Sequence, residues 1–431
     1  MQLEKTAMPT ATRLSRLTLV SAALAVMFAG TAKAVEPRVY QLEDGGAIAP
    51  HLALEIGNDD NPLRRNEGSK SSSFLRVQPQ VQYIVQRRNN TLSVGYTGDY
   101  VQYTEDYCLS QSGDCQFGAP DFNKASYEDH RLELNGRLEF SRRLRATLLL
   151  ARELENQPLG TGLSSDAGTL QSLVEPDSFH RTAASAVVSY GASQARGEAR
   201  FGLSYTDRDF RSDSANPGRN AGLDGLGESS VTPSATLLYR LGSRTQVFAG
   251  FSHSNVTGGN SERDIRSSFA GVEFDASAIT SGSFRVSDVN EDFSDTGEDI
   301  DYTGYSVEIV WKPRRFSTVT IGGSRETERA IIDDNIGIST TLDVNWVHYW
   351  RDRISSDVTV GWEKNKDVDG SGQVANSDAD DTTLRLRIGG NYNIRRWLDI
   401  GAFIETDNRD GQDDSRDFDR TVIGITANGT I

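Results

Sequence analysis

The sequence predicts an all-β fold: a transmembrane, antiparallel, up-and-down β-barrel of about 18 strands, with short periplasmic turns and long acidic outer loops. Three observations predict it: long stretches of alternating apolar and polar residues, a repeated hairpin unit, and a polar composition. The 431 residues carry a formal net charge of −16, and only 36% are hydrophobic. A membrane barrel accommodates this composition because only alternate residues face lipid. A disordered chain would lack the regular alternation of β-branched and aromatic residues.

The repeated unit is clearest at residues 382–407. Leu384, Leu386 and Ile388 alternate there with Arg385 and Arg387. Successive side chains of a strand point to opposite faces, so one face is aliphatic and the other is cationic. A short basic turn at 394–396 leads into a second strand, which runs out into an acidic loop. Because such hairpins recur along the chain, we expect one large β-structure and not several small domains.

The N-terminus has the pattern of a secretory signal peptide, which we place at residues 1–34. Arg13 and Arg16 precede an apolar run at 17–30, and Ala32 and Ala34 form a small-residue cleavage site. The run is too short for a comfortable membrane span. Removing four basic and one acidic residue with this segment changes the net charge from −16 to −19. No later window predicts a transmembrane helix. Residues 35–50 are interpreted as a periplasmic leader and 51–431 as the barrel.

The most regular strand lies at 127–140, where Leu132, Leu134 and Leu138 share one face and charged residues of both signs share the other. A half-buried strand of a soluble sheet would alternate similarly. The number of long strands with one fully solvated face favours the barrel. The predicted strands are 51–57, 74–85, 91–104, 127–140, 144–154, 178–190, 198–207, 232–240, 245–254, 264–274, 281–288, 301–311, 317–325, 335–349, 355–364, 380–393, 397–406 and 417–431.

The connections between these strands fall into two classes. One class is short and basic, as at 87–88, 142–143, 312–315, 351–353 and 395–396. The other is longer and mostly acidic: residues 288–301 and 405–419 each carry seven carboxylates. Outer-membrane barrels have short periplasmic turns and longer outer loops, so we expect the acidic loops to face outward. Aromatic residues near strand ends, such as Trp311, Trp350 and Trp397, fit a membrane boundary.

Cys108 and Cys115 lie in one polar loop, and in an exported protein such a pair predicts a disulfide. We find no enzyme motif. Asp129 and His130 are adjacent in a strand, so they point to opposite faces and do not form a catalytic pair. Residues 367–372 resemble half of a calcium loop but lack the later Glu, so they are interpreted as a solvated turn. We therefore predict no catalytic residue, no metal site and no cofactor.

The polar strand faces would line the lumen. Mixed Arg and carboxylate side chains there would either pair with each other or hydrogen-bond hydroxyl-rich solutes. The predicted lumen-lining residues are Arg131, Glu133, Arg137, Glu139, Glu308, Asp343, Asn345, Arg385 and Arg387.

At residues 54–63 (LEIGNDDNPL), and through Gly-containing strands that enter polar loops at 202–207 and 401–407, the chain resembles the outer-membrane β-barrel porins found with exopolysaccharide biosynthesis systems. The resemblance covers roughly 51–431, although the chain ends in Ile431 where such barrels often end in an aromatic residue. It implies a Gram-negative outer-membrane channel for polysaccharide export. A general or sugar diffusion porin and a structural or adhesive barrel are the alternatives. The expected partners are membrane lipid and lipopolysaccharide, the secreted polysaccharide and periplasmic export machinery, with no nucleic acid.

Overall fold

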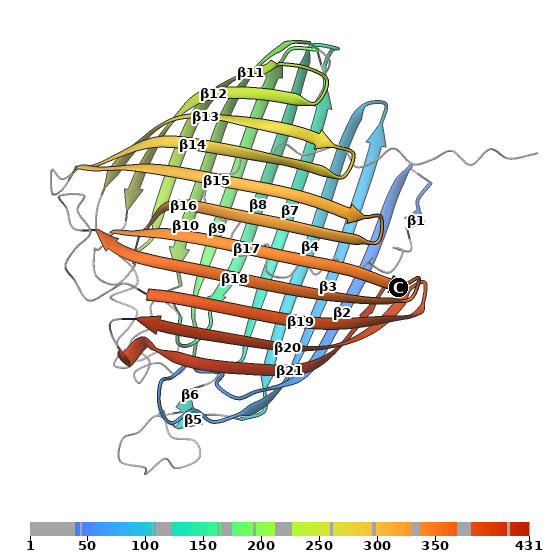
Figure 1. Cartoon of the computed structure of the whole chain (residues 1–431), viewed down its shortest axis with the longest axis vertical. Helices are drawn as coiled ribbons and strands as arrows, with labels where there is room; N and C mark the ends of the chain where they lie inside the picture. The colour runs from blue at the N-terminus through green and yellow to red at the C-terminus, as the bar shows by residue number, and fades with distance from the viewer. Residues whose placement is uncertain are drawn as a thin grey trace, which may run out of the picture.

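The computed structural model describes residues 39–430 except 44, 106, 109–121, 124, 162–163, 165–174, 193–194, 212–225, 259–261, 295–298, 330–335, 369–380 and 412–413. Eighteen long antiparallel strands form one closed sheet, each paired with its neighbours in the chain (Figure 1). This confirms the predicted up-and-down barrel and its strand number. Within the described residues, no helix combines the length and the apolarity needed to cross a bilayer.

The barrel strands are 12 to 16 residues long, enough for a tilted strand to cross a bilayer. They are β2(Gly46–Asp59), β3(Ser72–Arg87), β4(Asn90–Tyr103), β7(Tyr127–Glu139), β8(Leu144–Gln157), β9(Asp177–Tyr190), β10(Gly197–Phe210), β11(Glu228–Arg240), β12(Thr245–Gly258), β13(Arg263–Ser277), β14(Thr280–Phe293), β15(Asp299–Arg314), β16(Ser317–Arg329), β17(Ile336–Arg351), β18(Ile354–Val368), β19(Asp381–Arg395), β20(Leu398–Gly411) and β21(Phe418–Gly429).

Many strands extend further toward the long-loop end than the sequence predicted. The acidic segment 288–301 is mostly strand, because β14 continues to Phe293 and β15 begins at Asp299. The segment 405–419 is likewise strand up to Gly411, and the predicted connection at 207–231 shortens to 211–227. The prediction of long loops at 288–301 and 405–419 was therefore wrong, whereas the connection at 211–227 remains long. Beyond the bilayer both faces of a strand meet water, so the apolar alternation that marks a strand disappears although the backbone pairing continues.

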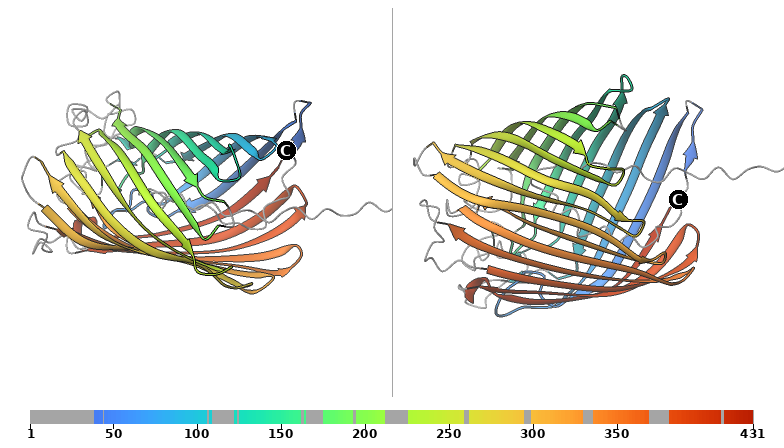
Figure 2. Two further views of the ribbon diagram at one scale, coloured as in Figure 1. Left: turned by 90° about the horizontal axis from the view of Figure 1, so that it is seen from above. Right: turned by 45° about the horizontal axis from the view of Figure 1, so that its top comes forward.

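The barrel closes where the first and last long strands meet, between β2 and β21 (Figure 2). We call this junction the seam. It contains only eight residue pairs, which join 52–59 to 422–429, whereas β2 pairs with β3 over fourteen residues. The first six residues of β2 therefore extend past the end of β21. The short strand β1(Tyr40–Gln41) covers part of this edge by pairing with Ile48 and Ala47. The first strand thus begins at Gly46, earlier than the predicted 51.

The two ends of the barrel differ. Short turns lie at one end, together with β1 and the C-terminus (Figure 1). At the other end a two-stranded sheet forms from β5(Tyr107–Cys108) and β6(Phe122–Asn123). The predicted disulfide of Cys108 and Cys115 lies outside the described residues, since Cys115 belongs to the omitted segment 109–121 and the side chain of Cys108 is not described.

Candidate functional site

The side chains of each strand fall on two faces, and contacts between strands that are not neighbours identify the inner one. Arg387 on β19 reaches Glu55 on β2, 3.7 Å away, although β20 and β21 lie between them. Side chains separated in this way can meet only on the concave side of the sheet. The alternating residues on the other face are apolar and exposed, such as Leu203 at 55% and Ile425 at 61%. The polar face therefore lines the lumen, and the apolar face meets lipid.

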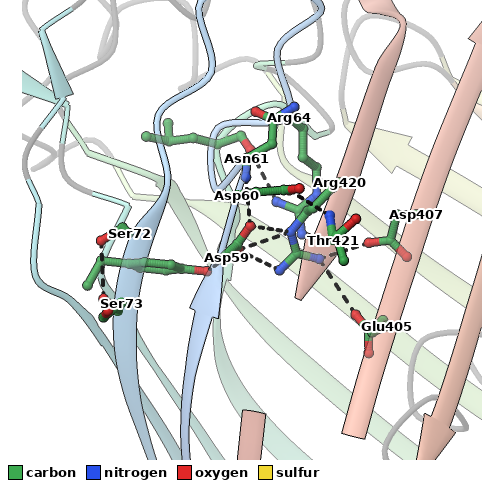
Figure 3. Close-up of polar contacts among 12 residues, drawn as sticks. Asp59, Asp60, Asn61, Arg64, Ser72, Ser73, Glu405, Asp407, Arg420 and Thr421 are labelled. Atoms are coloured by element: carbon green, nitrogen blue, oxygen red, sulfur yellow. Dashed lines mark hydrogen bonds and ion pairs between the residues drawn. The ribbon is translucent and has the colours of Figure 1, made fainter. Parts of the chain in front are cut away.

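A dense ion-pair cluster lies on the inner side of the seam (Figure 3). Arg420 of β21 donates to Asp59 of β2 and to Asp407 of β20, each at 2.8 Å, and lies 3.6 Å from Glu405. Asp59 is fully buried, and it also accepts a hydrogen bond of 2.9 Å from the hydroxyl of Tyr103 on β4. One guanidinium thus joins the first strand to the last two. These charge-assisted bonds therefore add to the eight backbone pairs that close the barrel.

Glycines make room for aromatic rings beneath this cluster. Gly57 and Gly424 face each other across the seam. A Cβ on Gly57 would lie 2.8 Å from the ring of Phe74, and a Cβ on Gly424 would lie 2.6 Å from the ring of Phe403. The guanidinium of Arg387 stacks 3.7 Å above Phe403. The seam therefore contains a stack in which a phenylalanine covers a glycine and an arginine covers the phenylalanine.

The first connection of the barrel folds across the long-loop mouth. Leu63, Ala125 and Leu159 come from three different connections and form a buried apolar cluster that packs against Tyr103. Arg64 donates to the backbone carbonyl of Leu159, 3.3 Å away. Burial lowers the pKa of the Arg64 guanidinium, and the nearby charge of Arg420 lowers it further. This segment therefore narrows the mouth. The connections at 105–126 and 207–231 lie largely outside the described residues.

Asn61 fixes this connection to the seam. Its side-chain amide donates to the backbone carbonyls of Arg65 and Asp419, each at 2.8 Å, and its Oδ1 accepts from the backbone N–H of Arg65. Asp59 in turn accepts a hydrogen bond of 3.0 Å from the backbone N–H of Asn61. The short polar motif after the first strand therefore positions the connection that folds over the mouth.

Further around the wall, inward charges pair across neighbouring strands. Arg131 on β7 pairs with Glu133 and with Glu153 on β8, and Glu153 lies 3.7 Å from Arg181 on β9. Such paired charges satisfy one another and leave little net charge on this part of the wall.

A second ladder of the same kind crosses β10 to β14. Glu228 lies 3.5 Å from Arg208 and 3.1 Å from Arg263, which in turn lies 2.8 Å from Glu291. These pairs lie toward the long-loop end of the strands.

The middle of the wall from β9 to β17 carries short hydroxyl side chains, which we call the hydroxyl row. Its members lie on the inner face, and cross-strand partners join them from Ser185 to Ser267 and again from Ser306 to Thr341, while Ser287 pairs with Phe269 and Gly304. Two pairs are hydrogen-bonded: Thr232 donates to Ser254 at 2.8 Å, and the hydroxyls of Ser324 and Thr341 lie 2.9 Å apart. Short side chains leave the lumen wide on this side. The row comprises Ser185, Ser204, Thr232, Ser234, Ser252, Ser254, Ser267, Ser287, Ser306, Ser324 and Thr341.

Arg285 lies among the residues of the hydroxyl row, and no described carboxylate pairs with it. Arg285 on β14 stacks 3.7 Å above Phe269 on β13, which covers Gly250 on β12. The arrangement repeats the glycine, phenylalanine and arginine stack of the seam. Among the described residues, however, Arg285 has no ion-pair or hydrogen-bond partner, whereas Arg387 lies 2.8 Å from Glu405.

The nine lumen-lining residues predicted from sequence occupy inner-face positions, spread over several parts of the wall. Arg131 and Glu133 belong to the ladder on β7 and β8. Arg385 lies 3.6 Å from Glu363, and Asp343 and Arg385 both pair in register with Gly361. Asn345 donates to Thr359 at 2.9 Å, and Arg387 belongs to the seam. The remaining three, near the short turns, are Arg137, Glu139 and Glu308. That any of them contacts a solute remains a prediction.

The sequence-based prediction missed Arg420, Asp59 and Arg285. The alternation could have identified two of them. Arg420 is an odd number of residues away from the exposed Ile423 and Ile425, and Arg285 lies between the exposed Phe284 and Val286. Both positions are therefore inward by periodicity.

Two further sequence features concern catalysis and metal binding: the adjacent Asp129 and His130, and the calcium-like segment at 367–372. Asp129 accepts from Asn156, while His130 contacts the hydroxyl of Tyr96 at 3.0 Å, so the two adjacent residues have separate partners. No group of three potential metal ligands occurs within the described ranges. The calcium-like segment at 367–372 lies largely outside them.

Three solved structures resemble the chain in fold. They are the FrpB iron transporter of Neisseria meningitidis (F3-3 variant; TM-score 0.43, 10% identity, 84% of this chain and 62% of that chain), the outer membrane channel DcaP of Acinetobacter baumannii (0.44, 10%, 91% and 99%) and OpdK of Pseudomonas aeruginosa with vanillate (0.44, 13%, 89% and 99%). The chain thus spans 62% of the length of FrpB. No curated protein matches it.

The barrel also matches a known protein family by sequence. Residues 47–429, which include nearly all of β2 to β21, match the family described as "Putative beta-barrel porin 2". The match confirms the predicted outer-membrane location and the porin resemblance. Over residues 47–429 the chain belongs to this family of outer-membrane β-barrel porins.

Proposed function

We propose that this porin-family barrel exports an exopolysaccharide across the outer membrane. The observation that carries the proposal is the hydroxyl row, which presents weak hydrogen-bonding groups along half of the inner wall. Each neutral hydrogen bond contributes only about 0.5–1.5 kcal/mol net. A sugar polymer can therefore exchange such bonds one after another and slide without being trapped.

The rest of the inner wall supports the same reading. Its charges are largely paired with each other, as at Arg131 with Glu153 and at Arg420 with Asp59. Paired charges hold the wall and do not form a tight site for a solute. Eighteen strands about 4.8 Å apart and tilted by ~40° give a backbone diameter of roughly 35 Å, too wide for side chains to fill. In this proposal the chain is a channel and not an enzyme, and it receives the polymer from periplasmic export machinery.

A genetic experiment with wall variants tests this proposal. Deleting the gene should abolish the extracellular polymer, and the wild-type gene should restore it. Replacing Ser252 and Ser267 together by Trp should narrow the hydroxyl row and reduce the secreted polymer severalfold, provided that the barrel still assembles. The matched control replaces Phe251, which faces lipid and is 53% exposed, by Trp. Normal secretion in the deletion strain would contradict export.

A second candidate is a diffusion porin for small anionic solutes, and Arg285 favours it. A guanidinium without a carboxylate partner, on a wall of short side chains, attracts anions from the lumen. Uptake of small solutes by the deletion strain distinguishes the two functions. Reduced uptake of a small carboxylate with normal polymer secretion would support the porin, and the opposite result would support export.

A further inference from the structure

An apolar groove runs along the outer face of the barrel at the seam. It exists because β21 contributes small residues there, while its neighbours on both sides contribute large ones: Gly429 lies between Leu398 on β20 and Leu52 on β2. The groove has a volume of about 340 Å³ and is almost entirely apolar. Its lining residues are Leu52, Leu54, Trp397, Leu398, Ala427, Gly429 and Thr430.

The groove is continuous with the lipid-facing surface. Leu52 and Leu54 share a face with Ile56, which is 63% exposed, and Ala427 shares a face with the exposed Ile425. The groove lies at the short-turn end, where exposed aromatic side chains form a partial belt from β9 to β20, as expected at the boundary between acyl chains and headgroups. These belt residues are Tyr190, Tyr239, Trp311, Trp350, Tyr392 and Trp397.

Arginine dominates the turns beside this belt. Counted from the last residue of one strand to the first residue of the next, the eight short turns hold thirteen arginines, no lysine and two carboxylates, an excess of eleven positive charges on an acidic chain. Arg395 and Arg396 directly precede Trp397 of the groove, and both are exposed. In the described part of the chain neither has an ion-pair partner.

We propose that the groove holds one acyl chain of an anionic phospholipid of the periplasmic leaflet, with its phosphate between Arg395 and Arg396. The apolar lining fits the chain, and the paired guanidinium groups fit the phosphate, which arginine binds through parallel N–H donors. The leaflet follows from the short turns, which lie on the periplasmic side in outer-membrane barrels. The inference depends on the membrane location and is independent of what passes through the lumen.

Brominated lipids test the site directly, because bromine on an acyl chain quenches a nearby tryptophan. The full chain would carry Trp397 alone, with Phe at Trp311, Trp346, Trp350 and Trp362. In phosphatidylcholine vesicles, brominated phosphatidylglycerol should quench Trp397 at a mole fraction roughly thirtyfold lower than brominated phosphatidylcholine, because two arginines next to an anionic headgroup favour it by about that factor. The double change Arg395→Glu and Arg396→Glu should remove the preference.

A single-tryptophan protein that keeps Trp311 is the matched control, since Trp311 lies beside Arg314 and Arg315 but outside the groove. Its quenching should not respond to the changes at Arg395 and Arg396. Equal quenching of Trp397 by both lipids, or a preference that survives the double change, would overturn the proposal. Relief of quenching by lipopolysaccharide and not by unlabelled phosphatidylglycerol would assign the groove to the other leaflet and also overturn it.

A second measurement applies if the single-tryptophan protein does not fold. Native mass spectrometry of the wild-type protein should detect retained phosphatidylglycerol. Ala427→Leu fills the groove from its floor while keeping the outer face apolar, so it should reduce retention severalfold. Equal retention by both proteins would count against the groove as the binding site.

Discussion

Two regions of the inner wall contain the same stack of glycine, phenylalanine and arginine but differ in what surrounds it. At the seam, Arg387 covers Phe403 and lies close to the carboxylates of Glu405 and Glu55. In the wall that carries the hydroxyl row, which we call the far wall, Arg285 covers Phe269 among short hydroxyl side chains. In both regions the phenylalanine ring packs against a glycine of the neighbouring strand. The difference indicates that the arginine at the seam serves closure, while the arginine on the far wall is available to the lumen.

The largest expected effect is a difference in the free energy of unfolding between variants of the two regions. Arg420→Met removes the cation that joins Asp59 to Asp407 and leaves a fully buried carboxylate without its partner, so it should destabilise the barrel by about 3–5 kcal/mol. Arg285→Met on the far wall should change stability little. Urea unfolding in lipid vesicles, followed by the mobility of folded and unfolded protein on gels, measures both. Equal losses would mean that the seam has no special role in closure.

A smaller effect tests which face of the far wall meets lipid. Leu203→Arg places a charge on the apolar face and should cost about 2–4 kcal/mol if the residue lies near the bilayer midplane. Ser204→Arg, one residue along the same strand, faces the lumen and should cost much less. The same unfolding measurement applies. Similar values for both variants would mean that the hydroxyl row had been assigned to the wrong face.

The third prediction examines the part of the stack that the two regions share. A Cβ at Gly424 or at Gly250 would lie 2.6 Å from the covering phenylalanine ring. Gly424→Val and Gly250→Val should therefore each cost about 1–3 kcal/mol through overpacking. Gly322→Val is the control, because a Cβ at Gly322 meets no atom within 4 Å. A much larger loss at only one of the two stacks would show that they are not equivalent.

Much of this architecture could be predicted from sequence, because alternation reports directly which residues face lipid. Leu384, Leu386 and Ile388 marked the outer face of β19, and Arg385 and Arg387 marked the inner one. Strand ends were predicted poorly where polar residues such as Asp292 continue a strand beyond the bilayer. The partners of inward charges could not be predicted at all. Asp59 and Arg420 are 361 positions apart, and only the register of closure brings them together.

The smallest effect concerns the lumen, and it compares the two arginines by ion selectivity. A unit charge shifts the energy of an ion 5–10 Å away in water by about 0.4–0.8 kcal/mol. The charge favours an anion and disfavours a cation by this amount each, so Arg285→Gln should shift the permeability ratio of anions to cations toward cations by roughly four- to fifteenfold, with no loss of stability. Arg387→Gln removes the cation nearest to Glu405 and Glu55, so it should also destabilise the seam, by about 1–3 kcal/mol. Planar-bilayer recording of purified protein gives the ratio, and urea unfolding gives the stability. If Arg285→Gln leaves selectivity unchanged while discrete conductance persists, its guanidinium is not exposed to the ion path, and the distinction between the two regions fails.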